Sequence, residues 1–266
     1  MTAPLRVVLV GWGAIGRTVA RLLPDADVEV VGVAVRDVAR ERNDLPAGSV
    51  LLSDPSELAA LNVDVVAEAA GRDSVEPWGH AALAAGADFI VSSVSALADA
   101  ELLASLRQAA QTGPGRLQIQ TGALGGIDAL AGAMLMGVDH VEHRIVKPPR
   151  AWQDTPAESL CNLDALDAPT AFFRDTAAAT ASAFPKNANV AMTTALAGVG
   201  PEATTIALVA DPTATTNRHE ISASGAFGSL EVAIANNPLP DNPKTSAMAA
   251  LNLARAINTR VAPIVI

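Results

Sequence analysis

Apolar residues in the first part of the chain, to about residue 120, come in short β-branched runs that alternate with alanine- and leucine-rich stretches. This alternation predicts repeated strand–helix units around a parallel sheet. Strands are expected at Leu5–Val10, Val28–Val35, Val50–Leu52, Val63–Ala67, Phe89–Val91 and Leu117–Ile119. Helices are expected at Ile15–Leu23, Pro55–Leu61, Pro77–Ala85 and Ala100–Ala110. The pattern therefore predicts a doubly wound α/β domain.

After Thr121-Gly122 the rhythm of the chain changes. A helix is expected near Ile127–Met136, and His140–Lys147 alternates like a half-buried strand that Pro148-Pro149 must stop, because proline has no backbone N–H. Further elements follow: helices at Ala171–Ala183 and Ala188–Leu196, a strand at Thr205–Ala210, and a hairpin around Ser224–Gly228. This second part is predicted to be an α+β domain.

The end of the chain is expected to return to the first domain. Asn242-Pro243-Lys244 is predicted to break the chain before a long alanine-rich helix at Thr245–Asn258. The expected division is residues 1–122, completed by 243–266, and residues 123–242 as the catalytic, substrate and dimerisation domain. An exposed sheet face would be a liability in a monomer, so a homodimer is expected.

The amino-acid composition argues against several classes of function. Lysine and arginine number 18 against 28 aspartate and glutamate, which argues against a general nucleic-acid or membrane surface. The single cysteine, Cys161, cannot form an internal disulfide or a thiolate cluster, and no histidine or acid spacing suits a metal. The chain enters a strand at once without a charged leader, so a cytoplasmic location is expected. The absence of tyrosine excludes oxidoreductases that use a tyrosine–lysine pair.

A glycine-rich turn, Gly11-Trp12-Gly13-Ala14-Ile15-Gly16, follows the first predicted strand and opens the first predicted helix. This is the context that a dinucleotide-binding Rossmann turn requires. The first glycine allows the tight turn, the second lets the backbone approach the pyrophosphate, and the third permits close helix packing. The helix N-terminus then holds the diphosphate. Ala70 and Gly71 are also assigned to the cofactor site.

The residue expected to contact the ribose is Arg36, followed by Asp37. An NAD-specific site usually carries an acid at this position. A guanidinium can bind a 2′-phosphate bidentately, whereas Asp37 could still serve NAD. Use of both NAD and NADP is predicted, the alternative being that Arg36 is a solvated surface charge.

Histidines are the leading candidates for proton transfer, and there are four. His80 lies in a predicted helix among alanines, where a structural role is favoured. His140 and His143 are three apart on one strand and should point to opposite faces. His219 begins a strand in the second domain and is the candidate general acid or base.

The segment Phe184–Ala191 places a lysine and two asparagines ahead of an apolar helix. Asn189 is either a helix cap or a carboxamide that bonds the nicotinamide end of the cofactor. Lys186 and Asn187 are candidate substrate contacts, and Lys147 is another cation that could meet a carboxylate. Ala123 follows the sixth predicted strand, where backbone would pass close to the nicotinamide.

Taken together, five motifs resemble the L-aspartate dehydrogenase family over essentially the whole chain: GWGAIG, TGALGGIDAL, VKPP, FPKNANVA and TNRHEISASGAFG. The resemblance implies oxidation of L-aspartate by NAD or NADP to iminoaspartate, which is hydrolysed to oxaloacetate and ammonia or passed to NAD biosynthesis. It places the family's active-site histidine on His219 and its further cofactor contacts on Ala123 and Asn189.

Two alternatives stay open at this point. Dihydrodipicolinate reductase shares the two-domain plan and a histidine–lysine strand similar to His143 and Lys147, but its serine-glycine-threonine turn is replaced here by Pro148-Pro149-Arg150. A non-catalytic sensor that binds dinucleotide is the other alternative, although no partner module accompanies the turn.

Overall fold

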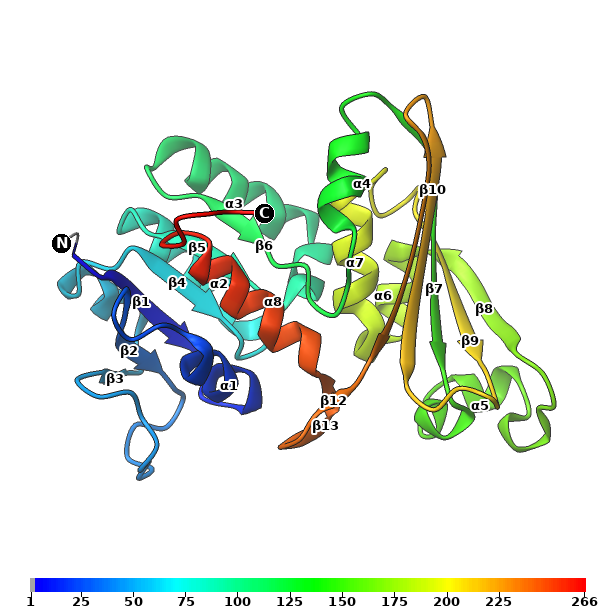
Figure 1. Ribbon diagram of the computed structural model, residues 1–266, viewed down its shortest axis with the longest axis horizontal. Coiled ribbons are helices and arrows are strands. Elements are labelled where there is room, and N and C mark those ends of the chain that lie inside the picture. Colours follow the sequence, from blue (N-terminus) through cyan, green and yellow to red (C-terminus); the bar gives the residue numbers. More distant parts are fainter. Residues whose placement is uncertain (1–2) are drawn as a thin grey trace. The chain divides into compact units, whose positions relative to one another are not determined.

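The computed structural model describes residues 3–266 and divides the chain into two compact units (Figure 1). The first unit holds the chain up to Gly122 together with Leu239–Thr245 and Ala249–Ile266. The second holds Ala123–Pro238 and Ser246–Met248. Within the described residues, no helix is long and apolar enough to cross a membrane.

The first unit is built on a six-stranded parallel sheet of order β3-β2-β1-β4-β5-β6. Its strands are β1 (Leu5–Val10), β2 (Val28–Ala34), β3 (Val50–Leu52), β4 (Val65–Glu68), β5 (Asp88–Val91) and β6 (Leu117–Ile119). Every strand expected from the sequence is present, within two residues at each end. The strand order reverses between β1 and β4, the switch point where doubly wound sheets bind their ligands.

Helices connect these strands: α1 (Ala14–Leu22), α2 (Arg72–Ala84) and α3 (Ala100–Thr112), with the 3₁₀ turns η1 (Pro55–Ala60) and η2 (Val94–Ala98). Two expectations were wrong in detail. The α-helix expected at Pro55–Leu61 is a 3₁₀ turn, capped by Asp54 and Glu57. Helix α2 begins at Arg72 rather than at Pro77, so Pro77 lies inside the helix, where its missing N–H leaves one intrahelical hydrogen bond unmade.

Helix α8 (Ala247–Asn258) belongs to the first unit from Ala249 onward (Figure 1). Gln120 Nε2 donates to the carbonyl of Ala249 (2.9 Å), and Asn252 Nδ2 donates to the carbonyl of Gly122 (2.8 Å). The helix begins two residues later than predicted. The expected break at Asn242-Pro243-Lys244 lies in a short strand, β13 (Asn242–Ser246), which pairs with β12 (Pro238–Leu239).

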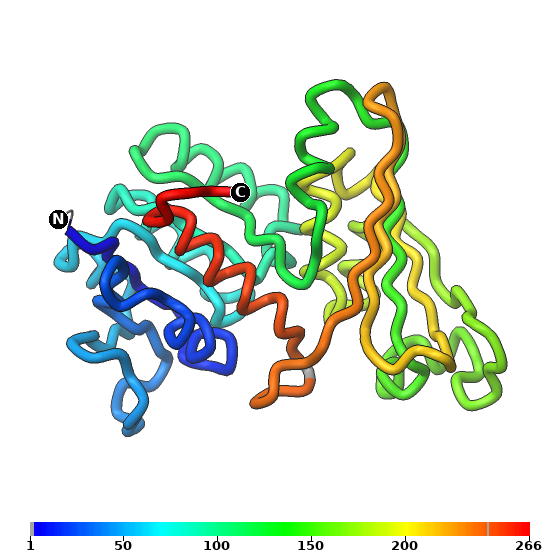
Figure 2. The backbone as a smooth tube through the Cα atoms, viewed as in Figure 1, coloured from blue at the N-terminus to red at the C-terminus, as the bar shows by residue number. Residues whose placement is uncertain are grey.

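The second unit contains a five-stranded sheet of order β11-β10-β7-β9-β8. Its strands are β7 (Val138–Lys147), β8 (Thr170–Thr176), β9 (Thr205–Ala210), β10 (Asn217–Gly225) and β11 (Gly228–Asn236). Only β7 and β9 pair in parallel. The expected hairpin is confirmed as β10 and β11, which run side by side, with β10 between β11 and β7 (Figure 2).

Helices α4 (Ile127–Ala133), α6 (Ala177–Ala183) and α7 (Ala188–Ala197) belong to this unit, with the short α5 (Ala157–Leu160) and the turns η3 (Pro149–Trp152), η4 (Leu163–Ala165) and η5 (Pro185–Asn187). The helix expected at Ala171–Ala183 was half wrong, because its first residues form β8. Phe172 packs edge-on against Trp152 with ring centroids 4.9 Å apart, so aromatic packing overrides the alanine-rich local preference.

The two faces of the second sheet differ in character. On one face, Ile145, Ile206 and Leu208 pack into a buried cluster with Ala191 and Ala195 of α7. On the other, charged side chains form ion pairs, among them Arg174–Glu142 (2.7 Å) and Arg144–Glu220 (3.0 Å). Residues that face the helices are therefore removed from water, which matters for the histidines described next.

Candidate functional site

A cavity of about 590 Å³ lies in the first unit, where β1, β2 and β4 end. It is lined by residues of the glycine turn and of the loops after β2 and β4, among them Gly11, Trp12, Gly13, Arg36, Asp37, Arg40, Arg42, Ala70, Gly71 and Arg72. Most of the residues assigned to a cofactor from the sequence thus share one cavity.

The glycines of the turn leave room for a ligand. Gly11 has a φ of +101°, and a Cβ on it would stand 2.8 Å from Ala69 O, so only glycine fits. A Cβ on Gly16 would collide with the carbonyl of Gly11. Gly13, by contrast, faces open space, and among the described residues no side chain caps α1. This cradle fits the diphosphate of a dinucleotide.

The loop after β4 is held by a buried carboxylate that the sequence analysis did not single out. Glu68 is fully buried at the end of β4. Its Oε1 accepts from the N–H groups of Ala70 (2.8 Å) and Gly71 (2.9 Å), and its Oε2 accepts from the N–H of Ser93 (2.9 Å). The amides of Ala70 and Gly71 therefore point to Glu68 and shape the wall of the cavity. An acid ending a buried strand is the signal that could have identified it.

The cavity is rich in guanidinium groups, because Arg36, Arg40, Arg42 and Arg72 all line it. Asp37, the acid that could serve NAD, accepts a hydrogen bond from the N–H of Ala39 (3.0 Å) within its own turn. The surroundings are thus predominantly cationic.

His219 lies in the second unit and is 5% exposed. Its Nδ1 stands 3.0 Å from Nε2 of His143, whose Nδ1 stands 2.9 Å from Oγ1 of Thr194 on α7. His140 is exposed, which confirms that it and His143 point to opposite faces. The sequence analysis missed Thr194 and gave His143 no catalytic role, although strand alternation already places His143 and Lys147 on one face.

Burial keeps both histidines of the pair neutral near pH 7. Desolvation lowers the pKa of His143 well below its ordinary value, and His219 adds to this effect. Burial and, second, the charge of Lys147 lower the pKa of His219 to about 4. A neutral imidazole has one nitrogen with a free lone pair, which can accept a proton.

Lys147 is held beside this pair. Its Nζ donates to Oδ1 of Asn187 (2.5 Å) and lies 4.5 Å from the ring centroid of Trp152. Burial and the charge of Lys186 lower its pKa to about 8. Pro148 and Pro149 replace residues of the serine-glycine-threonine turn of dihydrodipicolinate reductase. They lead into the turn η3, which ends at Trp152 and places its ring against the ammonium group of Lys147.

The other residues predicted for the site differ in exposure. Asn187 is buried and bonded to Lys147, whereas Lys186 and Asn189 are exposed. Ala123 is 8% exposed, and its carbonyl accepts from Asn236 Nδ2 (2.9 Å). The structure therefore brings Asn187 to Lys147, while the predicted roles of Ala123 and Asn189 stay predictions.

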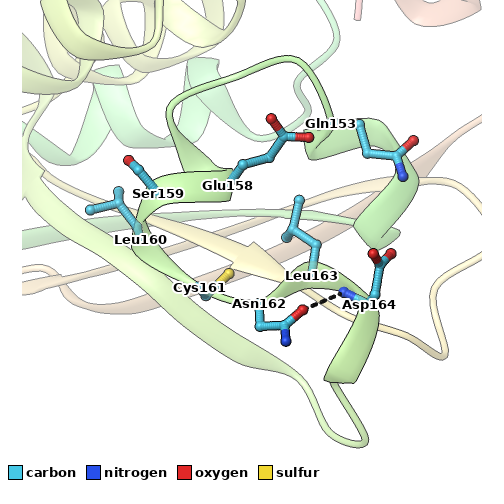
Figure 3. A pocket seen from close by; sticks show the side chains of 8 residues that line it. All are labelled: Gln153, Glu158, Ser159, Leu160, Cys161, Asn162, Leu163 and Asp164. Carbon is cyan, nitrogen blue, oxygen red and sulfur yellow. Dashed lines mark hydrogen bonds between the residues drawn. The ribbon is translucent and has the colours of Figure 1, made fainter.

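A second cavity, of about 470 Å³, lies around Cys161 (Figure 3). Its polar groups are engaged locally: Asn162 accepts from the N–H of Asp164, and Ser159 Oγ donates to the carbonyl of Pro156. Cys161 packs against the aromatic core, and burial raises the pKa of its thiol. In the described part of the chain, no group of three or more histidine, cysteine or acidic residues could hold a metal.

Two family models match this chain. Residues 128–260 match the family described as "Aspartate dehydrogenase, C-terminal", and residues 11–120 match "Homoserine dehydrogenase, NAD binding domain". The first covers β7 to α8, including the histidine pair. The second covers the glycine turn and the residues that line its cavity, and it supports a nicotinamide dinucleotide as the cofactor.

Relatives match over the full length. The chain is 52% identical to an L-aspartate dehydrogenase of Brucella anthropi, covering 100% of both chains. It is 42% identical to an L-aspartate dehydrogenase of Ralstonia pickettii, covering 96% of this chain and 97% of the relative. Among solved structures, aspartate dehydrogenase from Thermotoga maritima matches with a TM-score of 0.78 at 25% identity, covering 99% of this chain and 100% of the other.

Proposed function

Because this chain belongs to the aspartate dehydrogenase family, we propose that it oxidises L-aspartate to iminoaspartate, which water then converts to oxaloacetate and ammonia. One observation carries the proposal: His219 is buried and neutral, and it lies near the ammonium group of Lys147. Burial and the charge of Lys147 both lower the pKa of His219. A proton acceptor beside a carboxylate-binding cation is what a dicarboxylic amino acid requires.

In this proposal the first unit, with the C-terminal helix, is the dinucleotide-binding domain, and the second is the catalytic domain. The turn from Gly11 to Gly16 would hold the diphosphate, through Trp12, Gly13, Ala14 and Ile15, with the walls formed by Ala70 and Gly71. When bound, the nicotinamide ring supplies the hydride acceptor. Ala123 and Asn189 stay candidates for contacts with that ring.

His219 acts as the general base. The α-amino group of aspartate must lose its extra proton before its lone pair can help expel the hydride from Cα, and His219 accepts that proton. Burial leaves His219 a weak base in the free protein. The two carboxylates of aspartate would raise its pKa, because a nearby negative charge favours the imidazolium. The same residue orients the water that attacks the imine carbon.

Lys147 and Lys186 supply the positive charge that a dicarboxylate needs. After burial, the charge of Lys186 is the second cause that lowers the pKa of Lys147, so the two ammonium groups are close enough to act on one substrate. Asn187 is assigned here to positioning Lys147, because its carboxamide oxygen is already occupied by the lysine Nζ. This replaces the expectation of a direct contact between Asn187 and the substrate.

Use of both NAD and NADP is proposed from the ribose end of the cavity. Four arginines line this cavity, and Asp37, which follows Arg36, accepts a hydrogen bond from the N–H of Ala39. Guanidinium groups bind a 2′-phosphate well but also leave room for an unphosphorylated ribose. A comparison of KM for NADP⁺ and NAD⁺ tests this.

Three broader expectations stay predictions. A homodimer is testable by sizing in solution, a cytoplasmic location by cell fractionation, and a role in NAD biosynthesis by whether loss of the gene creates a requirement for a precursor of NAD.

The decisive experiment follows absorbance at 340 nm with L-aspartate, D-aspartate, glutamate, homoserine and dihydrodipicolinate. Turnover with L-aspartate, lost in His219→Ala, is expected. His140→Ala is the matched control, because His140 is exposed on the opposite face of β7 and should leave turnover unchanged. Dinucleotide binding without turnover of any substrate would favour a sensor, and activity confined to dihydrodipicolinate would favour the reductase.

A further inference from the structure

We propose that Thr194 and His143 form a tautomer-setting relay, which holds His219 with its proton on Nδ1 and its lone pair on Nε2. Both are positioning residues, since they act through His219 rather than on the substrate. The inference rests on the proposed function for its kinetic consequence, but the tautomer itself can be measured independently.

The relay begins at the helix. Oγ1 of Thr194 lies 3.1 Å from the carbonyl oxygen of Val190, one turn earlier in α7, and 2.9 Å from Nδ1 of His143. The hydroxyl has a single proton to donate. A carbonyl oxygen can only accept, so the proton goes to Val190, and Thr194 offers His143 a lone pair. If the proton pointed to His143 instead, two oxygen lone pairs would face each other at 3.1 Å.

The direction of the next two bonds then follows. His143 must donate from Nδ1 to Thr194, and because it is fully buried and neutral, its Nε2 carries no proton. That Nε2 lies 3.0 Å from Nδ1 of His219, which must therefore be the donor. Neutral His219 is left with an unprotonated Nε2, the nitrogen that a general base needs.

The charged surroundings do not reverse this order. On the same face, His219 meets the cation Lys147 of β7, with Lys186 of η5 close to that lysine. Helix α7 carries no ionisable residue, and Asp128 of α4 is exposed. On β11, Glu231 stands opposite Ser222, whose side chain lies on the other face of the sheet from His219. None of these groups offers Nδ1 of His219 an anionic acceptor in place of His143.

Thr194→Val tests the relay, because valine has nearly the same shape and lacks the hydroxyl. His143 then loses its acceptor, and the pair can invert, with His143 donating from Nε2 and His219 protonated on Nε2. Thr194→Ser is the conservative variant that keeps the hydroxyl. Thr180→Val is the matched control: Thr180 is also fully buried and bonds back along its helix to Thr176 (2.8 Å), on α6.

The first readout is the tautomer of His219, measured at pH 7 by long-range ¹H–¹⁵N correlation of the imidazoles. Wild type, Thr194→Ser and Thr180→Val should carry the proton on Nδ1, and Thr194→Val should move it to Nε2. The second readout is steady-state kinetics with aspartate. Because positioned acid–base catalysis contributes about 10²–10⁴-fold, kcat should fall at least about tenfold in Thr194→Val with KM nearly unchanged.

A wild-type His219 protonated on Nε2 would overturn the relay, as would a Thr194→Val variant that matches Thr194→Ser in both readouts. Absence of aspartate turnover in the wild type with the Nδ1 tautomer present would instead overturn the proposed function and leave the relay standing.

Discussion

Glu68→Gln replaces a fully buried carboxylate by an amide of the same shape, and it tests what shapes the dinucleotide cavity. Among the described residues, the carboxylate accepts six hydrogen bonds from the loops after β4 and β5 and from the first turn of α2. They come from the N–H groups of Ala70, Gly71, Ser92 and Ser93 and the hydroxyls of Ser74 and Ser93. All these donors meet at one side chain. The substitution therefore removes acceptors without creating a cavity.

The size of the destabilisation by Glu68→Gln follows from the number of hydrogen-bond donors at each carboxylate oxygen of Glu68. In the described part of the chain, Oε2 accepts from the N–H groups of Ser92 (3.2 Å) and Ser93 (2.9 Å) alone, so the amide nitrogen is best placed there. Two backbone donors then face another donor, and a buried donor without a partner costs about 1–3 kcal/mol. The free energy of unfolding of the first unit should fall by about 2–6 kcal/mol. Its melting temperature should fall by roughly 10 °C.

Differential scanning calorimetry measures the stability, and fluorescence titration measures dinucleotide affinity. The affinity should weaken as well, because Ala70 and Gly71 line the cavity. Glu57→Gln is the matched control: Glu57 also accepts from two backbone N–H groups, those of Ser53 and Asp54, but it is exposed and water can replace it. If Glu68→Gln were no more destabilising than Glu57→Gln, the carboxylate would not be what holds these loops.

Three further predictions concern the charged groups. Arg36→Ser should raise KM for NADP⁺ roughly 10- to 100-fold and KM for NAD⁺ much less, since only NADP⁺ loses a charge-assisted bond to its 2′-phosphate. An equal rise of KM for both cofactors in steady-state kinetics would contradict the assignment of Arg36. Lys147→Met should raise KM for aspartate by about the same factor, and Lys186→Met, at an exposed position, should raise it less. Burial lowers the pKa of His219 to about 4 in the folded protein, whereas the unfolded chain keeps the ordinary value of about 6.5. Between these two pH values the imidazole is protonated in the unfolded chain but not in the folded one. The free energy of unfolding should therefore fall by about 3 kcal/mol as the pH decreases through that window. Urea titrations should give a flatter pH profile for His219→Gln.

The parallel sheet was predictable from sequence because its central strands are buried on both faces over most of their length, so that apolar runs such as Val7–Val10 leave little ambiguity. The segment Ala171–Thr176 was not predictable locally. Its strand conformation depends on Trp152 and Phe184, which are distant in sequence and contribute the aromatic contacts.

In the candidate site, too, local sequence patterns were predictable and contacts between distant residues were not. The glycine turn and His219 could be predicted as candidates because each lies in a recognisable local context. An acid at the end of a buried strand marks Glu68 in the sequence. Its hydrogen bond to Ser93, the contact of Thr194 with His143 and the bond between Asn187 and Lys147 join elements that only the tertiary structure brings together. Alternation could place His143 on the inner face of β7, but not opposite a particular ring of β10.

The first unit is assembled from both ends of the sequence, and this sets an order of events during synthesis. The second unit is almost entirely continuous and can begin to fold while the ribosome is still producing α8. The parallel sheet must wait, because Leu253 and Ile257 of that helix are fully buried in the finished protein. Until they emerge, the nascent sheet keeps an apolar surface uncovered, and this is the interval in which a chaperone would be of use to the chain.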